Sequence, residues 1–332
     1  MKKNQSVDLL HGPIFKSLSL LAIPIMATYL IQMAYNLVDM LWIGFLGSGA
    51  VASVGVSGNF MYLANGLVNM PKIGSQALVG QSLGANNKKE TKNYIEAAFQ
   101  SSILFALIYG IIIIVFQKNL IQLFNLKDST IIQDAQNYLW ITCGFIIFSF
   151  VNQIFTGILT ASGHSKNTFI ATTTGLVLNL ILDPVLIFVC NLRVIGAALA
   201  TIIAQIIVTL VFLYDAKKLD LFQEIKLLSK PDKNHISKIL KIGFPPSIQS
   251  MLFTCISMYI ARLISSFGAI SVAVQKVGSQ IESISWMAAD GFSASMRSLR
   301  KIMEQKTIIE FKKVIKLECL SLVYGDCLLH VY

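Results

Sequence analysis

Long runs of apolar residues decide what this chain can fold into. About eight of them approach or exceed the roughly 20 residues that a helix needs to cross a bilayer. They lie at residues 14–46, 51–80, 94–116, 131–160, 168–190, 195–214, 237–266 and 270–296. Charged residues make up only 13% of the chain, well below the quarter or so of an ordinary soluble domain. We therefore predict an all-α integral membrane protein with about eight transmembrane helices.

The basic residues predict how the chain crosses the bilayer. Outside the apolar runs, Lys and Arg lie almost entirely in loops on one side, and the exceptions are Lys118, Lys127 and Arg193. The positive-inside rule then predicts a multi-pass protein of the bacterial cytoplasmic membrane with a cytoplasmic N-terminus. The net charge of +10 is spread over loops instead of forming one patch, so we expect no nucleic-acid partner. The expected partner is the lipid bilayer.

A repeat divides the chain. When the sequence is shifted by 221 residues, Pro24 falls on Pro245 and Gly47 on Gly268, so the first span is copied as the seventh. Copies separated by six crossings run in the same direction, which is the parallel kind of transporter repeat. We predict one complete six-helix bundle at 1–215, a cytoplasmic loop at 216–235 and the first two helices of a second bundle at 236–296. Residues 297–332 form an atypical tail.

Two acids inside apolar runs are the strongest site signal. Asp39 ends a row with Gln32 and Asn36 on one helix face, and Asp183 ends a row that contains Asn179. An ionisable group in hydrocarbon costs at least about 2.5 kcal/mol, so such residues are functional by default. Because burial disfavours the charged carboxylate, these acids are suited to exchange a proton or a cation such as Na⁺. The alternative is that each acid is a satisfied partner in a hydrogen bond between helices.

Other polar and soft side chains in the spans are candidates for a substrate cavity. Asn65 and Asn69 share a face of the second span with Lys72, and Gln32 and Asn36 of the first span are candidates too. Thr201 in the sixth span adds a hydroxyl to the candidate cation site. Further candidates are Met251, Met258, Lys276, Gln280 and Glu282. For the two methionines, packing in the core or against lipid is the more common role. Pairing of charges within the second bundle is the alternative for Lys276 and Glu282.

Nothing in the sequence indicates an enzyme. It has no P-loop, H-E-x-x-H or G-x-S-x-G motif, and its cysteines and histidines share no ligand spacing. We expect no cofactor, no metal centre beyond a possible Na⁺ site at Asp39, Asn179 and Asp183, and a monomer.

Four motifs resemble the multidrug and toxic compound extrusion (MATE) family. They are Ile23-Pro24-Ile25-Met26 through Tyr35-Asn36-Leu37-Val38-Asp39 to Gly44-Phe45-Leu46-Gly47, Val79-Gly80-Gln81-Ser82-Leu83-Gly84-Ala85, Asn179-Leu180-Ile181-Leu182-Asp183-Pro184 and Gly196-Ala197-Ala198-Leu199-Ala200-Thr201. The resemblance implies two six-helix bundles, alternating access, and export of cationic amphiphilic drugs or toxins in exchange for protons or sodium. It also implies a cation site formed by Asp39, Asn179, Asp183 and Thr201.

The resemblance stops near residue 296. Family members carry a second G-Q-x-x-G-A motif after helix eight, whereas 297–332 contain none. We therefore expect a chain truncated at its C-terminus, and one interpretation is that its tail is read in a shifted frame. Two alternatives remain open. One is a flippase for lipid-linked precursors, for which only Lys72, Arg262 and Lys276 offer cations in the spans. The other is a fragment that transports nothing.

Overall fold

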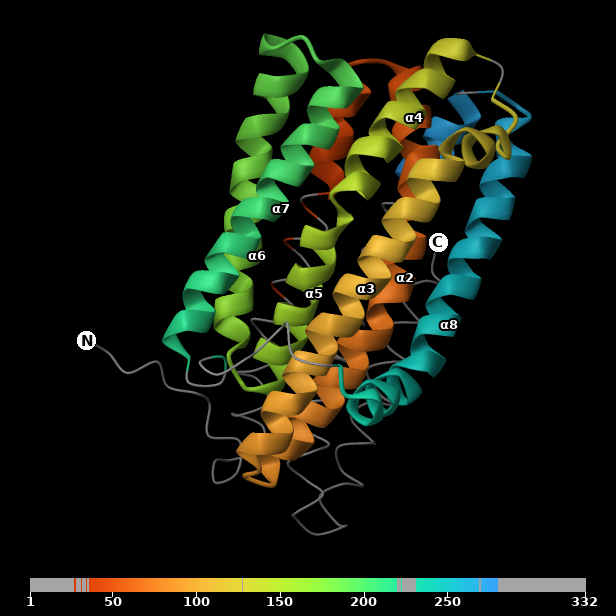
Figure 1. Ribbon diagram of the computed structural model, residues 1–332. Coiled ribbons are helices and arrows are strands. Elements are labelled where there is room, and N and C mark those ends of the chain that lie inside the picture. The colour runs from red at the N-terminus through yellow and green to blue at the C-terminus, as the bar shows by residue number, and fades with distance from the viewer. Residues whose placement is uncertain are drawn as a thin grey trace, which may run out of the picture.

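The protein is described here from a computed structural model, which describes residues 27, 31, 34, 36–126, 128–219, 222, 231–268 and 270–279. Residues 36–44 and 270–279 are helical. Between them lie α2 (Ser48–Gly84), α3 (Lys88–Gln122), α4 (Ser129–Gly144), α5 (Ile146–Ala161), α6 (Ser165–Pro184), the π-helix η1 (Val185–Val189), α7 (Arg193–Lys218) and α8 (Lys233–Ser265). These helices run side by side in one bundle (Figure 1).

The lengths of the helices confirm the membrane character of the chain. In the described part, five helices are long and apolar enough to cross a membrane, and a sixth span results if α4 and α5 count as one. They correspond to the second to seventh predicted runs. The first and eighth runs are described only in part, so the count of eight stays a prediction. The run at 131–160, predicted as one span, is divided in the structure into α4 and α5, which meet at an angle of 50°.

The bend between α4 and α5 has a packing cause. A Cβ added at Gly110 of α3 would lie 3.0 Å from the carbonyl oxygen of Cys143, so the backbones of α3 and α4 nearly touch just before the break. Phe145 then leaves helical geometry, and α5 begins at Ile146. Apolar residues continue through the break, and therefore hydropathy alone did not reveal it.

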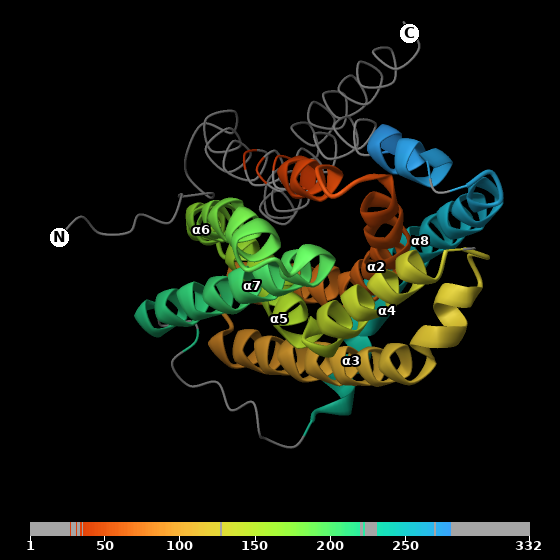
Figure 2. The same cartoon turned by 90° about the horizontal axis from the view of Figure 1, so that it is seen from above.

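Helix α2 occupies the centre of the bundle and packs against α3, α4, α5 and α8, as the view along the helices shows (Figure 2). Its buried residues include Val56, Phe60 and Val68 in the core that it shares with α3 and α4. The outer faces of α3 and α8 carry exposed apolar side chains, such as Ile111 and Val115 on α3 and Phe253 and Ile256 on α8. Exposed apolar faces of this length are expected only where lipid is the solvent.

Glycines allow α8 to lie directly on the backbone of α2. A Cβ at Gly74 of α2 would collide with the carbonyl group of Ile239, and a Cβ at Gly243 of α8 would collide with the carbonyl group of Met70. About two turns before Gly74 on α2, a Cβ at Gly66 would lie 2.8 Å from Cγ of Met251 on α8. Small residues at such crossings let membrane helices approach closely, since van der Waals packing is what holds them together in lipid.

The two glycines that the predicted repeat aligns, Gly47 and Gly268, have the same backbone conformation. Gly47 and Gly268 adopt positive φ angles of 106° and 103°, which favour glycine. Each donates its N–H to the residue three positions earlier, at 3.0 Å and 3.1 Å respectively, and in each case the N–H four residues later returns to the glycine carbonyl. The two copies therefore make the same turn between their first and second helices.

Candidate functional site

Asp183 lies at the end of α6 and is fully buried. Its Oδ1 accepts a hydrogen bond of 3.2 Å from the side-chain amide of Asn179, one turn earlier on the same helix. Its Oδ2 is also buried and receives no hydrogen bond from an amide, hydroxyl or amine of the described residues. A buried carboxyl with one unsatisfied oxygen is unfavourable unless a proton or a cation joins it.

Asp39 belongs to the helical segment 36–44 and lies near Asp183 in space. The two carboxyls are close enough to interact electrostatically, and Oδ1 of Asp39 is buried with no hydrogen-bond partner among the described residues. Two carboxylates that share a buried site repel each other, so one proton or one cation must be held between them for both to stay there. The structure thus brings together three of the four predicted cation-site residues: Asp39, Asn179 and Asp183.

Local backbone features fix the position of this acid pair. Pro184 lacks an N–H, so the regular hydrogen-bonding pattern of α6 ends there and the chain continues as the π-helix η1. Gly196 of α7 faces this segment, and a Cβ there would lie 2.6 Å from the carbonyl oxygen of Leu186. Close packing of α7 on η1 therefore holds the end of α6, and with it Asp183.

Two further predicted residues lie on neighbouring elements. Thr201 is on α7, which packs against α6, and its hydroxyl donates to the carbonyl of Ala197 at 3.0 Å. Lys276, from the helical segment 270–279, interacts electrostatically with Asp39. Its alkyl chain lies against Gly55 of α2, and its ammonium lies 4.7 Å from the ring centre of Tyr62.

The remaining predicted cavity residues are dispersed over α2 and α8. Asn65 accepts a hydrogen bond of 3.5 Å from Gln153 of α5, which in turn accepts one of 2.6 Å from Lys72. Asn36 and Asn69 are half-buried. Met258 packs against the core around Phe60, and Met251 covers Gly66. Gln32, Gln280 and Glu282 lie outside the described residues, as does the tail at 297–332.

A small pocket of about 100 Å³, lined by polar and apolar side chains, lies between α5, α6 and α7, and its α5 side was not predicted from the sequence. Asn152 is its best-connected residue: its amide donates to Oε1 of Gln205 at 2.8 Å, and its Oδ1 accepts from the hydroxyl of Thr209 at 2.9 Å. The signal was present, because the polar residues of α5 recur at helical spacing on one face. The lining residues are Ile31, Ser149, Asn152, Gln153, Thr156, Thr172, Gly175, Leu176, Ala204, Gln205, Val208 and Phe212.

Apolar helices of membrane-spanning length that enclose an acid pair and a pocket define a membrane transporter. The MatE family model matches residues 24–185. The multidrug export protein MepA of Staphylococcus aureus is 25% identical over 341 residues, covering 98% of this chain and 74% of MepA. The probable multidrug resistance protein NorM of Thermotoga maritima is 27% identical over 292 residues, covering 86% of this chain and 62% of NorM.

Solved structures are similar in fold. An outward-facing multidrug resistance MATE transporter of the MOP superfamily superimposes with a TM-score of 0.83 at 23% identity, covering 97% of this chain and 72% of that one. A MATE protein in a bent conformation gives a TM-score of 0.78, also at 23% identity, over 98% of this chain and 71% of that one. The MatE match and the similarity to MepA and NorM support a MATE family transporter.

Proposed function

We propose that this chain is a secondary antiporter that exports cationic amphiphilic drugs or toxins in exchange for protons or sodium. The relatives named as multidrug export and multidrug resistance proteins support the substrate class. The observation that carries the proposal is the electrostatic coupling of the half-buried Asp39 and the buried Asp183, each with one buried oxygen that lacks a hydrogen-bond partner among the described residues. Lys276 offsets part of the negative charge of Asp39, and a proton or sodium ion would offset the rest.

The same helices link the acid pair to the pocket. Asp183 ends α6, and Thr172 and Gly175 of the same helix line the pocket. At a rise of about 1.5 Å per residue, the pocket lies some 12–16 Å along α6 from the acid. Binding of a proton or sodium ion that favours one packing of α6 and α7 would therefore change the affinity of the pocket for substrate. Such coupling is a difference in ion affinity between two packings of the bundle.

The arrangement of the cations does not favour a flippase for pyrophosphate-linked lipids. Lys72 is hydrogen-bonded to Gln153, whereas Lys276 lies over Tyr62. The positions of Lys72 and Tyr62 on α2 are about 15 Å apart along the helix. A pyrophosphate group needs cations that converge on it, and these two side chains are directed to different parts of α2.

A transport assay tests the proposal. The purified full chain in vesicles loaded with ethidium is given an imposed pH gradient, sodium gradient or neither, and Asp183→Asn is compared with the unsubstituted chain. We expect the gradient-driven component to disappear in Asp183→Asn, since the amide cannot exchange a proton and binds a cation weakly. Asp128→Asn is the matched control, because it makes the same change at an exposed carboxyl that caps α4. Undiminished gradient-driven transport in Asp183→Asn would remove this residue from the mechanism.

A further inference from the structure

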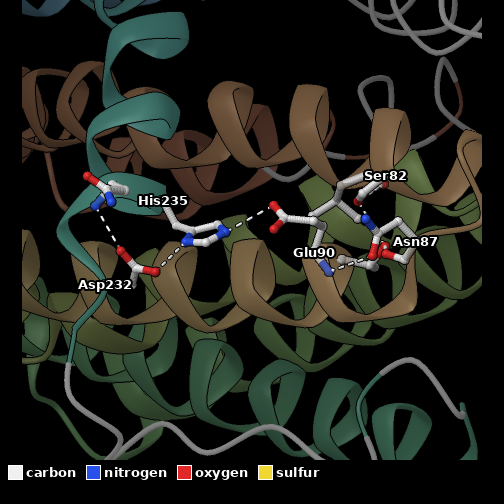
Figure 3. Close-up of polar contacts among 8 residues, drawn as sticks. Ser82, Asn87, Glu90, Asp232 and His235 are labelled. Atoms are coloured by element: carbon white, nitrogen blue, oxygen red, sulfur yellow. Dashed lines mark hydrogen bonds and ion pairs between the residues drawn. The ribbon is translucent and has the colours of Figure 1, made fainter.

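The first turn of α8 is joined to the first turn of α3 by a buried histidine (Figure 3). His235 of α8 is 8% exposed. Its Nε2 lies 3.0 Å from Oε2 of Glu90 on α3, and its Nδ1 lies 2.6 Å from Oδ2 of Asp232, the residue that caps α8. The contact links the predicted first bundle to the helix predicted to begin the second, at the end where the loops are rich in lysine.

Capping residues hold both carboxylates in place. Asn87 caps α3 by accepting the N–H of Glu90 at 3.2 Å, which fixes the turn that carries this glutamate. Asp232 accepts the N–H of Asn234 at 2.9 Å with its other oxygen. The hydrogen bond from His235 and then the one from the Asn234 amide lower the pKa of Asp232 below its ordinary value. The charged form of this cap is therefore favoured where it meets the imidazole.

Tyr94 is a further neighbour of His235 among the described side chains. The ring of Tyr94 on α3 packs edge-on against the imidazole, with centroids 4.8 Å apart. Helix α2, which packs against both α3 and α8, carries no titratable side chain after Lys72. Lys88, Lys89 and Lys233 in the first turns of α3 and α8 are exposed. In the second turns, Lys238 of α8 is exposed and Lys92 of α3 is half-buried.

The two contacts require a particular state of the ring. Carboxylates only accept hydrogen bonds, and a neutral imidazole has a single N–H to donate. Both contacts are therefore made together only by the imidazolium, which donates from Nδ1 and from Nε2. When the second proton leaves, one ring nitrogen presents a lone pair to a carboxylate, and that contact becomes repulsive.

We propose that His235 is a positioning residue of the transport cycle, which fastens α8 to α3 through Glu90 while it is protonated and releases them as the pH rises. The role in transport rests on the proposed antiporter function, whereas the contact itself does not. The attraction is strongest in acid and weakens in alkali, because the neutral ring can donate to only one of the two carboxylates. Movement of the two bundles against each other requires this contact to break at one stage.

A distance measurement in the full chain tests the proposal. Spin labels at Lys88→Cys and Lys233→Cys, in a background with the five native cysteines replaced by Ala, report the separation of the two helix ends. We compare about pH 6 with about pH 9, which bracket the range where histidine side chains change charge. We expect a single short distance in acid and a second, longer one in alkali. The ratio of the two populations should change on the order of tenfold, the effect of a hydrogen bond between charged groups.

Variants assign the pH response to this histidine. His235→Gln should give a distribution that no longer depends on pH, and Glu90→Gln, which keeps the imidazole, should give the longer distance at both pH values. His164→Gln is the control, because His164 is a second histidine beside a helix start and burial lowers its pKa; it should keep the response. A distribution that is the same at both pH values in the unsubstituted chain, or a response that survives His235→Gln, overturns the proposal. Since the readout is a distance, it stands whether or not ethidium is transported.

Discussion

The contact between α2 and α8 predicts a graded response to the smallest possible substitution. Gly243→Ala places a methyl group 2.7 Å from the carbonyl carbon of Met70 and 2.8 Å from its Cα. Gly74→Ala places one 2.8 Å from the carbonyl carbon of Ile239. Both obstacles are backbone, which cannot rotate away. At Gly66 the obstacle is Cγ of Met251 at 2.8 Å, and a methionine side chain adapts easily.

The expected magnitudes follow from these obstacles. Overpacking in a well-packed interior costs typically 1–3 kcal/mol, and we expect Gly243→Ala and Gly74→Ala at or above the upper end of about 3 kcal/mol because α2 and α8 must separate. That corresponds to a factor of about 160 in the unfolding equilibrium. Gly66→Ala should cost about 1 kcal/mol, since Met251 repacks. Gly44→Ala is the control, because its methyl would meet nothing within 4 Å.

The free energy of unfolding is measured for each variant by titrating folded protein in mild detergent with dodecyl sulfate and following tryptophan fluorescence, with refolding on dilution as the test of reversibility. We expect the order Gly243→Ala and Gly74→Ala lowest, Gly66→Ala intermediate and Gly44→Ala unchanged. If Gly243→Ala were as stable as Gly44→Ala, the backbone contact between α2 and α8 would be refuted.

Two further predictions concern polar groups. Asn152→Ala should lower the free energy of unfolding by about 1–3 kcal/mol in the same titration, because it leaves Oε1 of Gln205 and the hydroxyl of Thr209 without this partner; a value within about 0.5 kcal/mol of the unsubstituted chain would contradict it. Hydrogen bonds from the hydroxyl and the amide of Thr130 lower the pKa of the α4 cap Asp128 below 3.8. Its capping is therefore present above pH 3.8 and lost as the pH falls through the lowered pKa. Hydrogen exchange at the Thr130 amide should accelerate over that window, and in Asp128→Asn it should not change there.

Much of the fold followed from hydropathy, because lipid imposes the length of every span. The helices α2, α3, α6, α7 and α8 each cover an apolar run of the sequence. The bend at Phe145 did not follow, since it arises from the approach of α3 at Gly110, a residue far away in sequence. The π-helix after Pro184 was equally hidden. A proline predicts a break in the helical hydrogen bonds. It does not predict the π-helix that follows, which packs closely against Gly196 of α7.

The candidate site was predictable as a set of residues and not as an arrangement. The cost of placing Asp39 and Asp183 in hydrocarbon marked both as unusual. That the two carboxyls share one site depends on how the segment 36–44 packs beside α6, which no local pattern encodes. The polar face of α5 around Asn152 was missed for a different reason: uncharged residues in a span carry a much weaker penalty than acids.

The contacts of α8 differ in strength along its length, and this suggests where movement begins. Its middle is held by backbone packing at Gly74 and Gly243, which is lost only if the helices separate along several residues. Polar groups add to the apolar contacts at its two ends: His235 joins Glu90 at one end, and the hydroxyl of Ser265 donates to the carbonyl of Phe124 at the other. A hydrogen bond contributes about 0.5–3 kcal/mol net, so either end opens at a fraction of the energy needed to separate the middle. We therefore expect α8 to rock about its glycine contact, one end at a time.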